Sequence, residues 1–143
     1  MHIVEKQENP YKPALGWIRT NSTTGSAIGL VKLILSLWND DAAFSFRECV
    51  RSFDDIRSAW ALKIIAHFLK HGEDRFLRDA GKEVYELYPY IWDEGYAGSE
   101  ALKMVRRSSD FEEAARRTLK IEELQPESRQ YHQGTGGVRI GAP

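Results

Sequence analysis

Two histidines of this sequence have the spacing of metal ligands. His67 and His71 lie four residues apart, so both imidazoles would share one face of a helix, and Glu73 or Asp74 could follow as an oxygen ligand. No glutamate follows His67 directly, so the zinc-protease motif is absent. Lysines on the same outer face would repel a cation. We therefore expect two solvated histidines and no bound metal.

The only cysteine, Cys49, lies in the segment FRECVRSF. Arginines on either side would lower the pKa of its thiol if the side chain were exposed, but a lone cysteine in a short amphipathic segment is more often a small buried apolar residue. No other grouping of His, Cys and Ser proposes a nucleophile with its base. The sequence accordingly predicts no catalytic residues and no cofactor, and an enzyme with an unrecognised site is kept as an alternative.

The stretch NSTTGSAIGLVKLILSLWN has hydroxyls and glycines before an apolar run, as a phosphate-binding loop does. A P-loop needs lysine and then Ser or Thr directly after its second glycine, whereas Leu30 follows Gly29 here. An anion site at the first helical turn, with Arg19 nearby, is the weaker alternative. We expect instead that a threonine caps a helix and that Gly25 and Gly29 let another helix approach closely.

The aromatic run YELYPYIWDEGY is difficult to assign to the core alone. Its tyrosines and tryptophan at 85, 88 and 92 follow one another at spacings of three and four, which predicts that they line one side of a helix. Tyrosine and tryptophan anchor many protein interfaces, and neighbouring acids would favour a basic partner. The alternative is that the rings close the bottom of the core. The predicted partner-binding residues are Tyr85, Tyr88, Trp92, Glu86, Asp93 and Glu94.

Arginines in the last two predicted helices suggest a surface for nucleic acid or for an acidic protein. Acidic residues balance the basic ones in the same stretch, so a patch would require these two helices to form a hairpin that brings the arginines together. A nucleic-acid-binding module is therefore a second alternative, less favoured than a protein-binding one. The residues concerned are Arg106, Arg107, Arg116 and Arg117.

The elements that carry these residues are predicted to be helices throughout. An N-terminal arm over residues 1–21 should be held on the core by Leu15, Trp17 and Ile18. A polar, glycine-rich tail over residues 125–143 should be mobile. The expected helices cover residues 24–38 and 46–52, the stretch from the cap Asp54 to Gly72, residues 80–92 with a disturbance at Pro89, the stretch from Ser99 to a break at 108–110, and residues 111–124.

Length and composition agree with one globular domain. The chain has 143 residues, 42% of them hydrophobic, and a net charge of −1, so we expect an all-α, single-domain bundle of five or six helices over residues 1–124. A single cysteine favours a reducing cytoplasm. The apolar run from Ala27 to Trp38 is far shorter than the ~20 residues of a membrane crossing, so no membrane association is expected. The oligomeric state and the identity of a partner are left open.

Four stretches, LVKLILSLWND, FSFRECVRSFD, WALKIIAHFL and GKEVYELY, resemble an uncharacterised family of small helical proteins encoded by bacterial phages and plasmids. Leu37, Trp38 and Asn39 match its Leu-Tyr-Asn-Gly-like signature, with Asp40 where glycine is usual. The resemblance covers roughly residues 25–92. It implies no known activity. It suggests a non-enzymatic accessory factor of a mobile element that binds a protein, with inhibition of a host defence complex as one such role.

Overall fold

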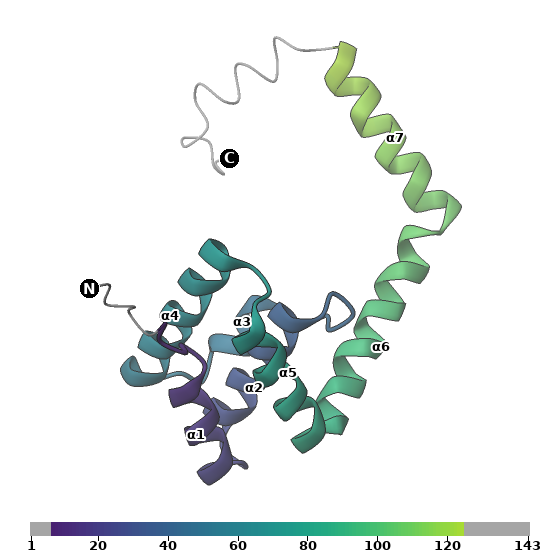
Figure 1. The fold of residues 1–143 in the computed structure, drawn as a ribbon. Coiled ribbons are helices and arrows are strands. Elements are labelled where there is room, and N and C mark those ends of the chain that lie inside the picture. Colours follow the sequence, from purple (N-terminus) through teal and green to yellow (C-terminus); the bar gives the residue numbers. More distant parts are fainter. Residues whose placement is uncertain (1–6, 125–143) are drawn as a thin grey trace, which may run out of the picture. The chain divides into compact units, whose positions relative to one another are not determined.

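The computed structural model describes residues 7–124, and every element in that range is a helix. The helices are α1 (Lys12–Thr20), α2 (Gly25–Trp38), α3 (Phe46–Val50), α4 (Asp55–His71), α5 (Arg75–Leu87), α6 (Pro89–Arg106) and α7 (Ser109–Leu124) (Figure 1). The prediction of an all-α fold is confirmed. The predicted mobile tail, 125–143, lies outside the described residues.

Side chains at the N-termini of the helices determine where several of them begin. Thr24, Ser45, Asp54 and Asp74 each accept a hydrogen bond from the backbone N–H three residues further on, so each satisfies a donor that has no partner inside its helix. At Ser45 the carboxylate of Glu48 also accepts from the backbone N–H of the serine, which completes a capping box. These bonds are local, which is why three of the four caps were predictable.

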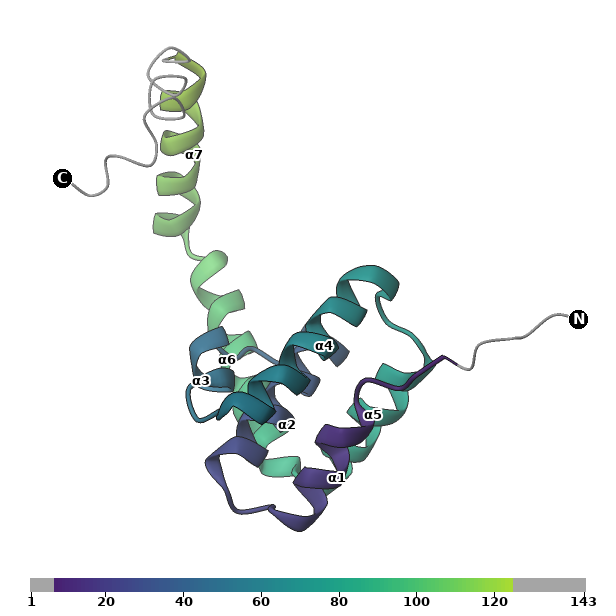
Figure 2. The ribbon, with the colours of Figure 1, turned by 90° about the vertical axis from the view of Figure 1, so that its left-hand side faces the viewer.

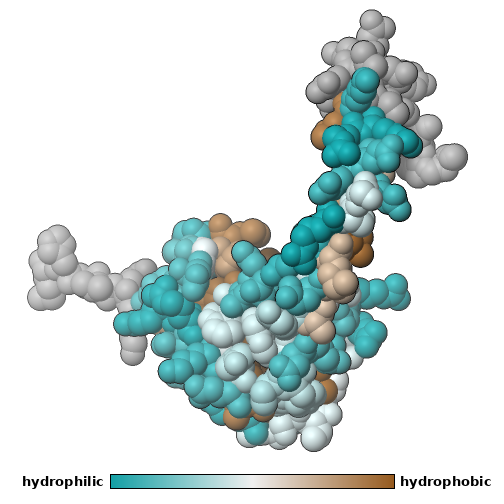
Figure 3. Space-filling view, turned by 90° about the vertical axis from the view of Figure 1, so that its right-hand side faces the viewer, coloured by the Kyte–Doolittle hydropathy of each residue, from teal (hydrophilic) through white to brown (hydrophobic). Residues whose placement is uncertain are grey.

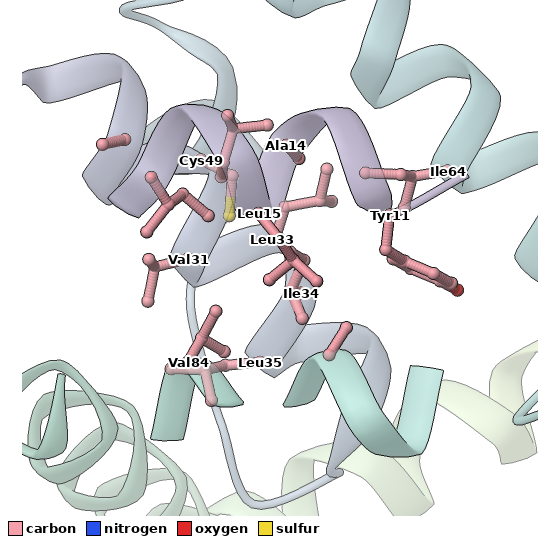
Figure 4. Packing of buried hydrophobic residues seen from close by; sticks show 14 of the residues in the cluster. Tyr11, Ala14, Leu15, Val31, Leu33, Ile34, Leu35, Cys49, Ile64 and Val84 are labelled. Atoms are coloured by element: carbon pink, nitrogen blue, oxygen red, sulfur yellow. The ribbon is translucent and has the colours of Figure 1, made fainter. Parts of the chain in front are cut away.

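Helix α2 lies at the centre of the core, with α1, α3, α4 and α5 packed around it (Figures 1 and 2). Its side chains Leu30, Val31, Ile34 and Leu35 are fully buried. Figure 4 shows how residues of α1, α3, α4 and α5 converge on this helix. The labelled members of this cluster are Tyr11, Ala14, Leu15, Val31, Leu33, Ile34, Leu35, Cys49, Ile64 and Val84.

The few small or polar residues of α2, namely Gly25, Gly29, Lys32 and Ser36, form a narrow stripe that faces α3 and the turn after it. A Cβ at Gly29 would overlap the carbonyl oxygen of Cys49, so only glycine permits this approach of the two backbones. Further along the stripe, Lys32 Nζ lies 3.4 Å from Glu48 Oε2. The expectation that these glycines serve close packing is confirmed, and the lysine within the apolar run is paired with an acid of the neighbouring helix.

Part of the expected N-terminal arm is a helix. Pro13 stands in the first turn of α1, where its missing N–H costs nothing, and Ala14, Leu15 and Ile18 are buried on the core. No helix was expected within residues 1–21. Pro13 instead marks the start of a helix that adds a face to the core.

The predicted helix over 80–92 is also corrected. Asp74 starts α5 earlier than expected, and α5 ends at Leu87, because Pro89 has no N–H to continue it. The same proline begins α6, which continues through residues 93–98, between two helices that were expected to be separate. Gly95 lies inside α6, at the point where the loop before α3 packs against the helix. The N–H of Ala43 in this loop donates to the carbonyl of Gly95 at 3.0 Å.

By its internal packing the chain divides into two units, Met1–Ala101 and Leu102–Pro143, with the boundary inside α6. The core described above lies in the first unit. In the second unit all side chains described, up to Lys120, are exposed, so the end of α6 and α7 do not form the hairpin that an arginine patch would require. Among the described residues, no helix is both long and apolar enough to cross a membrane.

Candidate protein-binding surface

Four aromatic rings from three helices touch one another on one side of the first unit. Trp38 at the end of α2 packs against Tyr85 of α5 and Trp92 of α6, with ring centroids 5.8 and 5.9 Å apart. Tyr85 and Trp92 are 5.6 Å apart, and Trp92 continues to Tyr96 at 6.1 Å. We call Trp38, Tyr85, Trp92 and Tyr96 the aromatic cluster.

The cluster is anchored at its base and open at its edge. Trp38 rests on Gly81 of α5 so closely that a Cβ there would overlap the indole. Both tryptophans are partly buried against the core, whereas Tyr85 and Tyr96 remain 40% and 44% exposed. Figure 3, which views the side where α6 lies, shows a broad pale area of intermediate hydropathy, the range of Trp and Tyr. The cluster therefore combines fixed rings with accessible ones.

Tyr88, the central residue of the predicted stripe, is not part of this surface. It is 6% exposed, and its hydroxyl donates to the carbonyl of Ser22 at 3.2 Å. Burial raises the pKa of its phenol. The stripe was predicted on one continuous helix, but α5 ends before Pro89, and the change of direction turns Tyr88 into the core. Tyr85 and Trp92 remain together because α5 and α6 bring them side by side.

Acidic and basic residues both lie on the helices that carry the cluster, and the exposed bases of α5 include Arg78 and Lys82. The predicted rim residues Glu86, Asp93 and Glu94 are all exposed, on the two helices that carry Tyr85 and Trp92. The hydroxyl of Tyr96 donates to Glu100 Oε1 at 3.4 Å. On the other side of Trp38 a pocket of about 650 Å³ is lined by Asp40, Asp41 and Glu73 together with Leu37, Trp38, Asn39 and Phe68. Negative charge is therefore concentrated at the pocket beside Trp38, whereas α5 carries acids and bases in equal number.

The histidine pair has a structural role in the first unit. His67 Nε2 lies 2.6 Å from Asp74 Oδ2, which ties the end of α4 to the start of α5, and the His67 side chain is only 11% exposed. Of the two histidines expected in solvent, only His71 is exposed, with its ring 4.4 Å from that of His67. Among the described residues no group of three or more His, Cys, Asp or Glu is arranged to hold a metal ion.

Two other candidate sites considered from the sequence, the Cys49 thiol and the anion site at the first turn of α2, have structural roles. Cys49 is 2% exposed, and burial raises the pKa of its thiol to about 11, so it carries no thiolate at neutral pH. Arg19 forms a two-point ion pair with Glu83 at 2.6 and 2.7 Å. Thr24 accepts from the N–H of Ala27 as a cap. The first turn of α2 is therefore closed by the protein's own groups.

The four arginines proposed as a nucleic-acid surface lie on the end of α6, the residue after it, and α7. All are exposed. Arg107 Nε donates to the carbonyl of Lys103, and Arg117 pairs with Glu113 one helical turn away at 2.6 Å. Because the end of α6 and α7 do not form the hairpin that such a patch would require, Arg106 and Arg107 are not packed against Arg116 and Arg117.

Sequence reasoning missed two members of the aromatic cluster, Trp38 and Tyr96. Tyr96 is four residues after Trp92, so the two side chains share one face of α6. This relation was missed because no continuous helix was predicted over residues 92–96. Trp38 is separated from Tyr85 by the whole of α3 and α4, so no local pattern connects them. Comparisons with known protein families, curated proteins and solved structures find no match for this chain. The resemblance to small phage and plasmid proteins thus stays a prediction.

Proposed function

We propose that this protein is a non-enzymatic protein-binding module whose aromatic cluster receives a basic segment of its partner. One observation carries the proposal: rings from α2, α5 and α6 form a continuous group that the core anchors on one side and leaves open on the other. A surface built from three helices is fixed before binding, so little conformational entropy is lost when a partner docks.

The residue types match those that contribute most to binding between proteins. Tyrosine and tryptophan offer large contact areas with few rotatable bonds, and their polar tips tolerate partial exposure. Partly open rings next to a buried base are the arrangement expected of an anchor. Tyr85 and Tyr96 are 40% and 44% exposed, so a partner could contact both rings.

Charge supports a basic partner. The pocket beside Trp38 is lined by acids but by no basic residue, and exposed acids follow Tyr85 and Trp92 directly in the chain, although α5 also carries exposed bases. Lysine or arginine of a partner would find carboxylates for ion pairs and aromatic faces for cation–π contacts. The proposed partner is a host or viral protein, in keeping with the resemblance to mobile-element proteins, and inhibition of a host defence complex is one role such binding would serve.

The experiment uses an array of basic peptides and NMR spectra of the tryptophan indole N–H groups. The protein has its four tryptophans at 17, 38, 60 and 92, and Trp17 and Trp60 pack against each other in a separate pair with ring centroids 6.2 Å apart. A peptide that binds the cluster should shift the signals of Trp38 and Trp92 and leave the other two in place. Binding should weaken as salt is raised.

Matched variants separate binding from folding. Alanine at Tyr85 or Tyr96 should weaken peptide binding by about tenfold or more with the melting temperature nearly unchanged, because both side chains are partly exposed. Tyr90→Ala is the control, since Tyr90 is 57% exposed on α6 but outside the cluster. Equal binding by all three variants, or peptide-induced shifts confined to Trp17 and Trp60, would show that the cluster is not the binding surface.

A further inference from the structure

Helix α4 carries an apolar row of side chains on the side that faces away from the core. The row recurs at spacings of three and four, which places it on one face of the helix, opposite the buried Arg57, Ala61 and Ile64. Its two leucines, Leu62 and Leu69, are 68% and 79% exposed, and its two alanines are exposed as well. We call Ala59, Leu62, Ala66 and Leu69 the α4 seam.

The α4 seam has the pattern of a helix-pairing surface. The outer face of a helix that packs on a core normally carries charged and polar residues. In the seam, small and large apolar side chains alternate instead, with the seven-residue repeat of helices that pack against other helices. All four side chains are exposed, so no described element covers them. None of them belongs to the aromatic cluster.

The sizes of the four side chains define how such a pair would form. We infer that α4 pairs with the α4 of a second copy of this chain in antiparallel orientation. A two-fold axis at the level of Ile64 sets each residue opposite the one equally far beyond that level. Leu62 then faces Ala66 of the second copy, and Ala59 faces Leu69, so every layer holds one large and one small side chain. A parallel pair would set leucine against leucine and alanine against alanine, and alternate layers would be overfilled and underfilled.

The seam fits a second copy because it is complementary to its own reverse. Its order along the helix is small, large, small, large, and the reversed order is large, small, large, small. The same four residues therefore supply both halves of every layer. A two-fold contact between identical chains requires this self-complementarity, whereas a contact with an unrelated helix does not.

The charges beside the seam agree with the antiparallel register. Asp55 continues the seam toward the start of α4, Lys63 and Lys70 follow one edge, and the other edge carries the uncharged Ser58 and Ile65. The reversed copy brings Lys70 within one helical turn of Asp55, and the two-fold axis repeats this pair, whereas a parallel pair would set Asp55 beside its own copy.

One approach of like charges remains in this register, between the two Lys63 side chains. They lie at the edge of the contact, where solvent and salt screen them. Glu8 also lines the same pocket as Lys63, so an acid stands close by. That pocket, of about 320 Å³, borders Ala66 as well, which leaves room for the leucine that faces this alanine from the second copy.

The first experiment measures the mass of the full chain by sedimentation equilibrium over a concentration series. We expect a monomer–dimer equilibrium. Leu62→Asp should weaken dimerisation by about a hundredfold or more, because the dimer would bury two carboxylates, one from each copy. The melting temperature of this variant in dilute solution should be nearly unchanged, because Leu62 is exposed in the single chain.

The matched control is Leu119→Asp on α7, where the leucine is 61% exposed. This variant should dimerise as the unchanged protein does. A chain that stays monomeric at all concentrations would overturn the inference. So would a dimer that Leu119→Asp abolishes and Leu62→Asp leaves intact.

An exchange of sizes tests the register. Leu62→Ala sets alanine against alanine and should weaken the dimer by about tenfold. Adding Ala66→Leu returns one large and one small side chain to the same layers and should restore the dimer. Adding Ala59→Leu should not, because residue 59 faces Leu69. Equal rescue by both additions, or by neither, would contradict the proposed register.

Cross-linking tests the orientation. Cys49 is buried and will not react, so an introduced cysteine is the accessible thiol. With a short bismaleimide, Lys63→Cys should cross-link to its own copy, because both positions lie near the two-fold axis on the same edge. Lys70→Cys should not, since its two copies stand roughly 18 Å apart along the helices, although a mixture of Lys70→Cys with Ile56→Cys should. Self-cross-linking of Lys70→Cys, or none by Lys63→Cys in a dimeric sample, would overturn the antiparallel pair.

Discussion

A single carboxylate, Asp74, performs two tasks at the corner between α4 and α5. One oxygen caps α5 by accepting from the N–H of Leu77 at 3.0 Å, and the other lies 2.6 Å from His67 Nε2. Burial alone would raise the pKa of this carboxyl, but the hydrogen bonds from His67 and Leu77 and the charges of the two histidines outweigh it, and the pKa is lowered. The folded state therefore favours the ionised form.

This lowered pKa predicts a pH-dependent effect of Asp74→Asn. Asparagine keeps the cap but not the charge, so at neutral pH the variant should lose about 1 to 3 kcal/mol of unfolding free energy. A group whose pKa is depressed by folding contributes stability above its unfolded pKa and loses it as pH falls through the folded value. The difference between variant and parent should therefore vanish in strong acid.

Urea unfolding of both proteins from neutral to strongly acidic pH measures the difference. Asp79→Asn, an exposed change on the same helix, is the control and should be nearly neutral throughout. A stability loss for Asp74→Asn that is equal at all pH values would show that the charge has no part in it.

Arg57 is held in place by an aromatic ring and by an acid. The guanidinium of Arg57 lies 3.3 Å from the centroid of the Trp17 ring, and its Nη1 bonds Asp54 at 3.1 Å. Trp17 belongs to α1, so this stacking fastens the N-terminal helix to the start of α4. The arginine is 8% exposed, and its Nε finds no hydrogen-bond partner, as is also true of the indole nitrogen of Trp17.

At the scale of the element, Gly81 shows that packing against a neighbouring helix can outweigh helix propensity. Alanine is preferred over glycine inside helices by about 1 kcal/mol. At Gly81 of α5, however, a Cβ would overlap the ring of Trp38. The close approach that glycine permits also seats the base of the aromatic cluster.

Replacement of this glycine by alanine should therefore destabilise the protein. We expect Gly81→Ala to lower the unfolding free energy by about 1 to 3 kcal/mol through overpacking, and to shift the fluorescence of Trp38. The matched control is Gly16→Ala in α1, where a Cβ would meet nothing within 4 Å. There the helix preference acts alone, so thermal unfolding should show a gain of up to about 1 kcal/mol. A gain of stability at Gly81 would mean that the indole moves away at little cost.

At the scale of the whole molecule, the buried core ends before the second unit begins. The last buried side chain on α6 is Ser99, and the described side chains after Glu100 are exposed. A chain that stops at Ser108 should therefore unfold with the same melting temperature as the full chain, because the described side chains that it lacks are exposed.

Calorimetry of the two proteins over a range of concentrations tests this expectation. A shortened chain that melts far lower even in dilute solution would place residues beyond Ser108 in the core of the first unit.

Much of the helical framework could be predicted from local chemistry. Thr24, Ser45 and Asp54 cap helices through bonds to residues three positions away, and Gly72 ends α4 with a φ of 65°. These interactions involve neighbours in the chain, so the sequence displays them directly. The apolar run of α2 likewise indicated a helix surrounded by others, and it is the centre of the core.

The arrangement of the aromatic residues could not be derived in the same way. Pro89 ends one helix and begins another, and only the packing of α5 and α6 on the core decides that Tyr88 turns inward while Tyr85 and Trp92 meet. Trp38 joins them from α2 because Gly81 lets its ring approach α5. These contacts join residues far apart in the chain, and their energy depends on how the helices cross. The spacing of residues along the chain does not determine how the helices cross. The sequence therefore indicated which aromatic residues matter, whereas the surface that they form is determined by the tertiary structure.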